Sequence, residues 1–112
     1  MRISYYTKSR IVIEDYHIKG ESLSSIEVSF GQKQIEKYPI TYVLKYKNSD
    51  FVKISGIFER RTFKPTELTT RSTNYNSFDR IEKMCEDAKK VTEDSKLVDL
   101  IQQNIDSQSI ES

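Results

Sequence analysis

The chain is poor in the residues that build common catalytic and cofactor motifs. Its 112 residues include one cysteine, Cys85, one histidine, His17, three glycines, two prolines and no tryptophan. A single cysteine excludes an intrachain disulfide. There is no glycine-rich phosphate loop, and the motifs GxSxG, CxxC and HExxH are absent. We therefore expect a non-catalytic protein without cofactor or metal.

Long hydrophobic runs are missing as well. No apolar segment approaches the roughly 18 residues that a membrane span requires. The N-terminal sequence MRISYYTKSR lacks the apolar core of a signal peptide. We therefore expect a cytoplasmic protein with no membrane partner. Residues with AT-rich codons, such as Ile, Lys and Tyr, are common, and Ala88 is the one alanine, which favours an AT-rich bacterial or phage genome.

Three isolated groups carry reactive chemistry, and each has a simpler structural interpretation. His17 has no catalytic partner that the sequence places beside it, so we interpret it as an ordinary half-exposed strand residue. Cys85 falls on the apolar face of a predicted helix and is interpreted as a small core residue. Asp50, Glu59 and Arg60 follow the acidic–acidic–basic order of metal-dependent nucleases, but Asp50 is more simply a turn former.

The most regular pattern is the alternation of apolar and polar residues over positions 39–63. Apolar and aromatic residues occupy the even positions 40–46, and lysines occupy positions 45 and 47. The polar segment 48–50 follows, and a second alternating run begins at Phe51. This pattern predicts a β-hairpin with one apolar face and one face rich in lysine and tyrosine.

Shorter strands are predicted before this hairpin, over residues 2–7, 10–19 and 23–30. The apolar parity switches at Glu14-Asp15, which indicates a bulge or bend, and Lys19-Gly20 indicates a turn. Gly56, within the second hairpin strand, indicates a bulge or a close contact. Residues 64–76 are rich in Thr, Asn and Ser and are expected to form an irregular connection.

From Phe78 the apolar period changes to three and four residues, which predicts an amphipathic helix with Asn76 or Ser77 as its N-cap. Polar residues 92–95 interrupt the apolar stripe, so two helices or a kinked helix are expected over 77–107, with a frayed tail from Asp106. The whole chain, 1–112, is predicted to be a single α+β domain. Its N-terminal antiparallel sheet has about five strands, over about residues 2–61, and packs against one or two C-terminal helices.

Charge is divided unevenly along the chain. Residues 1–71 contain 13 Lys and Arg against 8 Asp and Glu, a net charge of +5. Residues 72–112 contain 5 against 9, a net charge of −4. The acidic helices either pair with the basic sheet internally or leave a dipolar surface that steers a partner.

Basic and aromatic residues concentrate in the segment 45–64. The predicted partner-binding residues are the cations of this segment: Lys45, Lys47, Lys53, Arg60, Arg61 and Lys64. Those at odd positions should lie on the solvated face of the hairpin. That face has three interpretations: a soluble surface whose lysines prevent aggregation, a protein-binding surface, or a surface that binds nucleic-acid phosphates and bases.

Three function hypotheses follow from these observations. The first is a small non-catalytic protein that binds another protein, such as an inhibitor, an immunity protein or a phage counter-defence factor. The second is a nucleic-acid-binding domain that uses the basic hairpin 45–64. The third is a homo-oligomer whose copies pair through the strand edge at residues 2–7.

Overall fold

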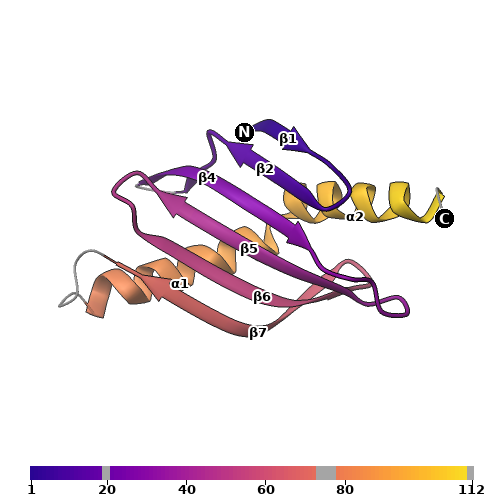
Figure 1. Ribbon diagram of the computed structural model, residues 1–112. Coiled ribbons are helices and arrows are strands. Elements are labelled where there is room, and N and C mark those ends of the chain that lie inside the picture. Colours follow the sequence, from indigo (N-terminus) through magenta and orange to yellow (C-terminus); the bar gives the residue numbers. More distant parts are fainter. Residues whose placement is uncertain (19–20, 73–77, 111–112) are drawn as a thin grey trace.

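The chain forms an antiparallel sheet with two helices packed on one of its faces (Figure 1). The computed structural model describes residues 1–18, 21–72 and 78–110. The described strands are β1 (Arg2–Tyr6), β2 (Arg10–Glu14), β3 (His17–Ile18), β4 (Glu21–Phe30), β5 (Tyr38–Tyr46), β6 (Phe51–Glu59) and β7 (Thr62–Arg71). The helices are α1 (Phe78–Glu93) and α2 (Ser95–Ile110). The predicted α+β class, with an N-terminal antiparallel sheet and two C-terminal helices, is confirmed.

Each main strand pairs with the next main strand along the chain. The described order is β1-β2-β4-β5-β6-β7, with the two-residue β3 pairing with β4 outside this path. Sequential antiparallel pairing is expected, because short turns connect neighbouring strands without a crossover. Asp15, between β2 and β3, has a positive φ of 55°, which confirms the predicted break at Glu14-Asp15.

Two predicted boundaries are wrong. Residues 64–71, expected to be irregular, form most of β7, so the sheet has six main strands rather than about five. The tail from Asp106, expected to be frayed, is helical to Ile110, and its Gln108 donates a 2.9 Å hydrogen bond to the carbonyl oxygen of Lys8. The predicted turn at Lys19-Gly20 and the predicted N-cap at Asn76 or Ser77 lie outside the described residues.

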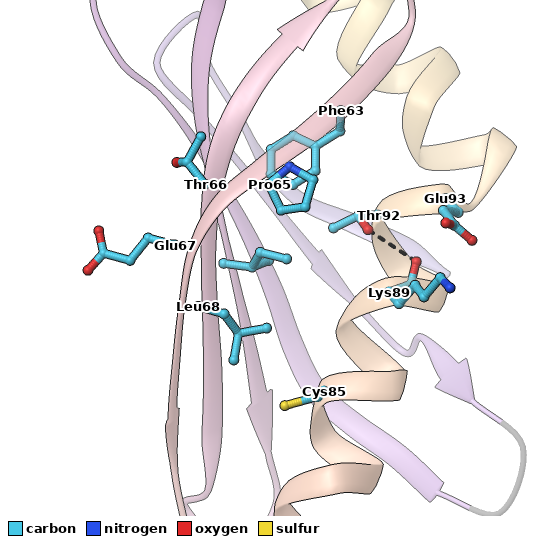
Figure 2. Close-up of a pocket in the computed structure, with 10 residues that line it drawn as sticks. Phe63, Pro65, Thr66, Glu67, Leu68, Cys85, Lys89, Thr92 and Glu93 are labelled. Atoms are coloured by element: carbon cyan, nitrogen blue, oxygen red, sulfur yellow. Dashed lines mark hydrogen bonds between the residues drawn. The ribbon is translucent and has the colours of Figure 1, made fainter.

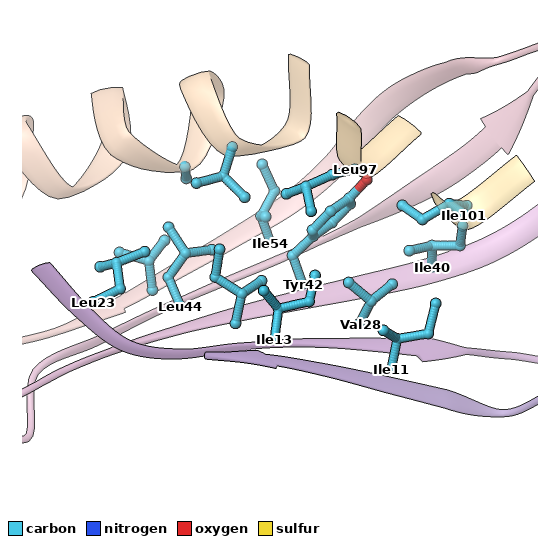
Figure 3. Packing of buried hydrophobic residues seen from close by; sticks show 14 of the residues in the cluster. Ile11, Ile13, Leu23, Val28, Ile40, Tyr42, Leu44, Ile54, Leu97 and Ile101 are labelled. Atoms are coloured by element: carbon cyan, nitrogen blue, oxygen red, sulfur yellow. The ribbon is translucent and has the colours of Figure 1, made fainter. Parts of the chain in front are cut away.

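The core lies between the sheet and the helices. Even-numbered residues of β5 and β6 face the helices and are buried, as the alternation predicted. Figure 3 shows this layer, with Ile11 and Ile13 from β2, Tyr42 from β5, and Leu97 and Ile101 from α2. Burying a side chain of this size contributes about 1.5–3 kcal/mol, so this one layer provides most of the driving force for folding.

The predicted helix break falls at Asp94, and Asp94 caps the second helix. Its Oδ1 accepts a 2.9 Å hydrogen bond from the backbone N–H of Lys96, and its carbonyl oxygen accepts one from Val98. A side-chain oxygen in this position satisfies a backbone donor at the helix start. The Tyr16 hydroxyl donates to the other carboxylate oxygen of Asp94. Burial, together with this bond, raises the pKa of Tyr16 above its ordinary value.

A buried polar network attaches α1 to the β5–β6 hairpin. Asp50, predicted to be a simple turn former, has a side chain that is 1% exposed. Its Oδ2 accepts hydrogen bonds from Arg80 Nε at 3.2 Å, Asn48 Nδ2 at 3.0 Å and Ser72 Oγ at 3.3 Å. The Arg80 guanidinium also stacks over the Tyr46 ring, 4.7 Å from its centroid. Asp50 therefore joins the hairpin turn to the first turns of α1.

The two buried tyrosines of β5 differ in how their hydroxyls are satisfied. The Tyr46 hydroxyl donates a 2.7 Å hydrogen bond to Asp87 of α1. The Tyr42 hydroxyl has no hydrogen-bond partner among the residues described. Burial raises the pKa of the Tyr42 phenol, so this hydroxyl stays neutral inside the core.

Changing each tyrosine to phenylalanine separates these two roles. Tyr42→Phe removes an unsatisfied hydroxyl, so the free energy of unfolding should stay constant or rise by up to about 1 kcal/mol. Tyr46→Phe removes the 2.7 Å hydrogen bond to the buried Asp87, whose remaining donor is Lys83 at 3.4 Å, and should lower the free energy of unfolding by about 1–3 kcal/mol. Urea denaturation monitored by circular dichroism measures the free energy of unfolding of both variants. A larger loss for Tyr42→Phe than for Tyr46→Phe would contradict the hydrogen bonding described for the two hydroxyls.

Gly56 provides a test of the β6–β7 packing. The register between the two strands shifts at Ser55/Gly56, which confirms the predicted bulge. A Cβ on Gly56 would collide with the carbonyl oxygen of Lys64 and lie 2.8 Å from the Phe63 ring. We expect Gly56→Ala to lower the free energy of unfolding by roughly 1–3 kcal/mol. In the control Gly31→Ala, the nearest atom would be a Pro39 ring carbon at 3.1 Å, a milder contact, so an equal loss in both variants would count against this packing.

Candidate functional site

The cations predicted to bind a partner lie at two ends of the β5–β6–β7 region. Lys45 and Lys53 are exposed on the face of the sheet away from the helices, and Lys47 follows the end of β5. Lys45 lies 3.8 Å from Glu27 of the neighbouring strand β4. The predicted outward orientation of Lys45 and Lys53 is confirmed.

The remaining cations lie at the opposite end of β6. Arg60 and Arg61 form the two-residue turn into β7 and have positive φ values of 51° and 63°. Arg61 pairs with Asp99 of α2, and Lys64 is exposed on β7. Since a strand rises about 3.4 Å per residue, the length of β6 separates this group from Lys47 by about 30 Å. The six predicted cations therefore do not form one patch.

The structure instead forms an apolar groove between β7 and α1, with a volume of about 430 Å³ (Figure 2). Its floor includes Ile54 of β6. Its walls are formed by residues of the two elements on either side: Phe63, Pro65, Thr66, Glu67 and Leu68 of β7, and Cys85, Lys89, Thr92 and Glu93 of α1. Figure 2 shows Leu68 and Cys85 directed toward the space between strand and helix, whereas Glu67 points away from the helix.

A bulge in β7 places the apolar residues of this strand on the helix side. Gly56 pairs with Pro65 and Ser55 pairs with Glu67, which leaves Thr66 as an extra residue. Before the bulge, Phe63 and Pro65 share the parity that faces the helix. Beyond it, Leu68 pairs with the buried Ile54 and takes over that face. The bulge thus reverses the side-chain parity and directs Leu68 toward the groove.

On its helical side the groove is lined by Cys85, which belongs to a second apolar stripe of α1, and by Lys89, Thr92 and Glu93. Met84, Ala88 and Val91 are buried against the sheet, whereas Phe78 and Ile81 are 84% and 36% exposed. With Cys85, they follow the three- and four-residue spacing of one helix face. Cys85, predicted to be a core residue, is half-buried and lines the groove. That prediction is wrong because α1 packs on the sheet through its other stripe.

The groove adjoins a free edge of the sheet. Among the described strands, β7 pairs with β6 alone, so the backbone groups on its other side remain available for pairing. Lys64 and Pro65 blunt the first half of this edge, because proline has no N–H to donate. The second half, Glu67–Arg71, contains no proline and continues as a regular strand that includes Leu68, which is 42% exposed.

Sequence reasoning missed this site because β7 was assigned to an irregular connection. The available signal was the spacing of Phe63, Pro65 and Leu68, which is two residues and then three. A step of three breaks a simple alternation, but it is the pattern of a strand with one bulged residue. The exposed stripe of α1 was also visible in the sequence, since Phe78, Ile81 and Cys85 are apolar residues on one helix face.

The other predicted chemistry stays separate from the groove. His17 lies on β3, where it pairs with Ser22 and is exposed. Within residues 1–18, 21–72 and 78–110, no three His, Cys, Asp or Glu side chains are placed to hold one metal ion.

Neither of the two described helices combines the length and hydrophobicity that crossing a bilayer requires. Comparisons with protein-family models, curated proteins and solved structures find no match.

Proposed function

We propose that this chain is a non-catalytic protein-binding protein that takes an extended segment of its partner along the free edge of β7. The observation that carries the proposal is the apolar groove beside that edge, formed by Leu68 on the strand and Cys85 on α1. An inhibitor, an immunity protein or a counter-defence factor would work in this way, by occupying a segment that its partner needs.

An extended polypeptide fits this site better than a folded helix or a small molecule. Its backbone N–H and C=O groups would pair with those that β7 presents at its edge. Its side chains would point alternately to the two faces of the enlarged sheet, with same-face residues about 6.8 Å apart. One or two apolar side chains would then lie in the groove, against Leu68 and Cys85.

The charges around the groove support recognition by shape and burial rather than by charge. Lys89 and Glu93 line the α1 wall and carry opposite signs, and Glu67 points away from the helix. Mixed rim charges contribute little affinity, because exposed pairs are worth less than about 1 kcal/mol. The partner segment is therefore expected to be apolar at alternate positions, with no strong requirement for net charge.

The nucleic-acid alternative has less support. Phosphate binding needs cations along one continuous surface. Lys45 lies near Glu27, Arg61 pairs with Asp99, and the length of β6 separates the two groups.

A random peptide library displayed on phage tests the proposal. We expect the selected peptides to carry apolar residues at alternate positions. A synthetic peptide of the selected sequence, measured by fluorescence anisotropy, should lose affinity for Leu68→Glu by at least about tenfold, because the substitution removes an apolar contact and bound peptide would desolvate the new carboxylate. Thr69→Glu is the matched control, since Thr69 pairs with Lys53 on the opposite face of the sheet, and it should bind as the parent does.

Cys85 gives a second readout within the groove. It is the one cysteine of the chain, so thiol labelling reports on this site alone. The bound peptide should slow the reaction of Cys85 with a maleimide dye. Unchanged labelling, or equal peptide affinity of Leu68→Glu and the parent, would contradict the proposed site. Binding of a DNA oligonucleotide that weakens steeply with salt and with Arg60→Ala/Arg61→Ala would instead favour the nucleic-acid alternative.

A further inference from the structure

The opposite edge of the sheet, β1, concentrates exposed apolar residues. All five residues from Arg2 to Tyr6 are exposed. Ile3, Tyr5 and Tyr6 are 44–48% exposed, and the preceding Met1 is 55% exposed. Single exposed apolar residues are ordinary, but neighbouring ones on one edge strand indicate a surface that another element covers.

A bulge at Ser4 places two of these residues, Ile3 and Tyr6, on the same face, whereas Tyr5 pairs with Val12 on the other face. The register from β1 to β2 shifts between Ile3 and Tyr5, so that Ile3 pairs with Ile13 and Tyr6 pairs with Ile11. Ile11 and Ile13 are fully buried in the core. Ile3 and Tyr6 therefore extend the core layer by one strand on the helix side of the sheet, and there they remain accessible to water.

Apart from this bulge, β1 lacks the features that prevent edge pairing. The segment RISYY contains no proline and no lysine, and its one charge, Arg2, pairs with Glu14. The β7 edge, by contrast, carries Lys64 and Pro65 in its first half. An unprotected apolar edge presents backbone groups and side chains that a second strand satisfies together.

We infer that β1 pairs antiparallel with β1 of a second copy of this chain, around a two-fold axis near Ser4, so that the two sheets become continuous. A strand paired with itself in this way is self-complementary, and the contact closes as a dimer. Ile3 of one copy would lie opposite Tyr6 of the other, on the helix side of both sheets, and the apolar layer would run across the interface.

The charges at the two ends of the β1–β2 hairpin favour this orientation. One end carries Glu14 and Asp15 with Arg2, and the other end carries Lys8 and Arg10, of which Arg10 also pairs with Glu27 of β4 at 3.1 Å. An antiparallel pair sets the acidic end of each copy beside the basic end of its partner. A parallel pair would place ends of like charge together, which disfavours association.

The dimer would leave both grooves open, because β7 is the other edge of the sheet. Each dimer would then present two grooves, one at each far end. A partner that carries two copies of the bound segment would bind to the dimer more tightly than a single segment binds to one groove. The dimer does not depend on the proposed peptide binding, so either can fail alone.

Sedimentation of the full chain over micromolar to millimolar concentrations tests the inference. We expect a monomer–dimer equilibrium for the parent and an increase in its dissociation constant of at least about tenfold for Ile3→Lys/Tyr6→Lys. Leu68→Lys, on the other edge, is the matched control and should dimerise as the parent does. A parent that stays monomeric throughout, or a dimer that only Leu68→Lys disrupts, would overturn the inference.

Disulfide crosslinking tests the strand orientation. In a Cys85→Ser background, a copy with Ile3→Cys should crosslink to a copy with Tyr6→Cys, because antiparallel pairing brings these residues opposite each other on one face of the sheet. Crosslinks of Ile3→Cys only with itself, or no crosslinks in any mixture, would contradict the arrangement. Circular dichroism confirms that each variant remains folded.

Discussion

The buried ion pair between Asp50 and Arg80 is the interaction on which the arrangement of α1 depends. None of the side chains from Phe78 to Lys83 is buried, and the first buried residue of the helix is Met84. Apolar packing therefore does not hold the first turns of α1 on the sheet. Arg80 reaches back to Asp50 and lies over the Tyr46 ring, and two turns later Asp87 accepts the hydrogen bond from Tyr46. Removing one partner would leave a charge buried without compensation, which costs several kcal/mol.

This polar attachment explains why the groove is open. A helix held by its apolar face alone would turn its widest apolar stripe toward the sheet. Here the polar contacts fix the rotation of α1 so that Met84, Ala88 and Val91 face the core. Cys85 is left on the side that faces β7, and Phe78 and Ile81 stay exposed. The bulge at Thr66 turns Leu68 toward the same space, and strand and helix together form the groove.

Much of the fold was predictable because each pattern had one dominant physical cause. Alternation over 39–63 predicted β5 and β6, and the helical period from Phe78, with its polar break, predicted the two helices. The sequence did not reveal β7, since the bulge reverses its parity and its exposed face is rich in threonine. It also did not reveal that Asp50 is buried, because its partner Arg80 is 30 positions away and nothing local marks the pairing.

The candidate site shows the same limit. Lysine and arginine are conspicuous in a sequence, so the segment 45–64 appeared to be one basic surface. In the folded chain its cations divide between two ends, and acidic residues on β4 and α2 lie next to two of them. The groove, by contrast, is built from residues of two elements that are unremarkable when each is considered alone. The two edges of the sheet also differ: the β7 edge is partly blunted beside the groove, and the β1 edge carries apolar residues.

A double-mutant cycle on Asp50 and Arg80 tests most directly whether this ion pair holds α1 in place. The free energies of unfolding of the parent, Asp50→Ala, Arg80→Ala and the double variant provide the coupling energy. If the pair holds the helix, each single change should cost about 3–5 kcal/mol, and the double change should cost little more than either. Single losses that add to within about 0.5 kcal/mol would mean that the two side chains act independently, and this account of α1 would be wrong.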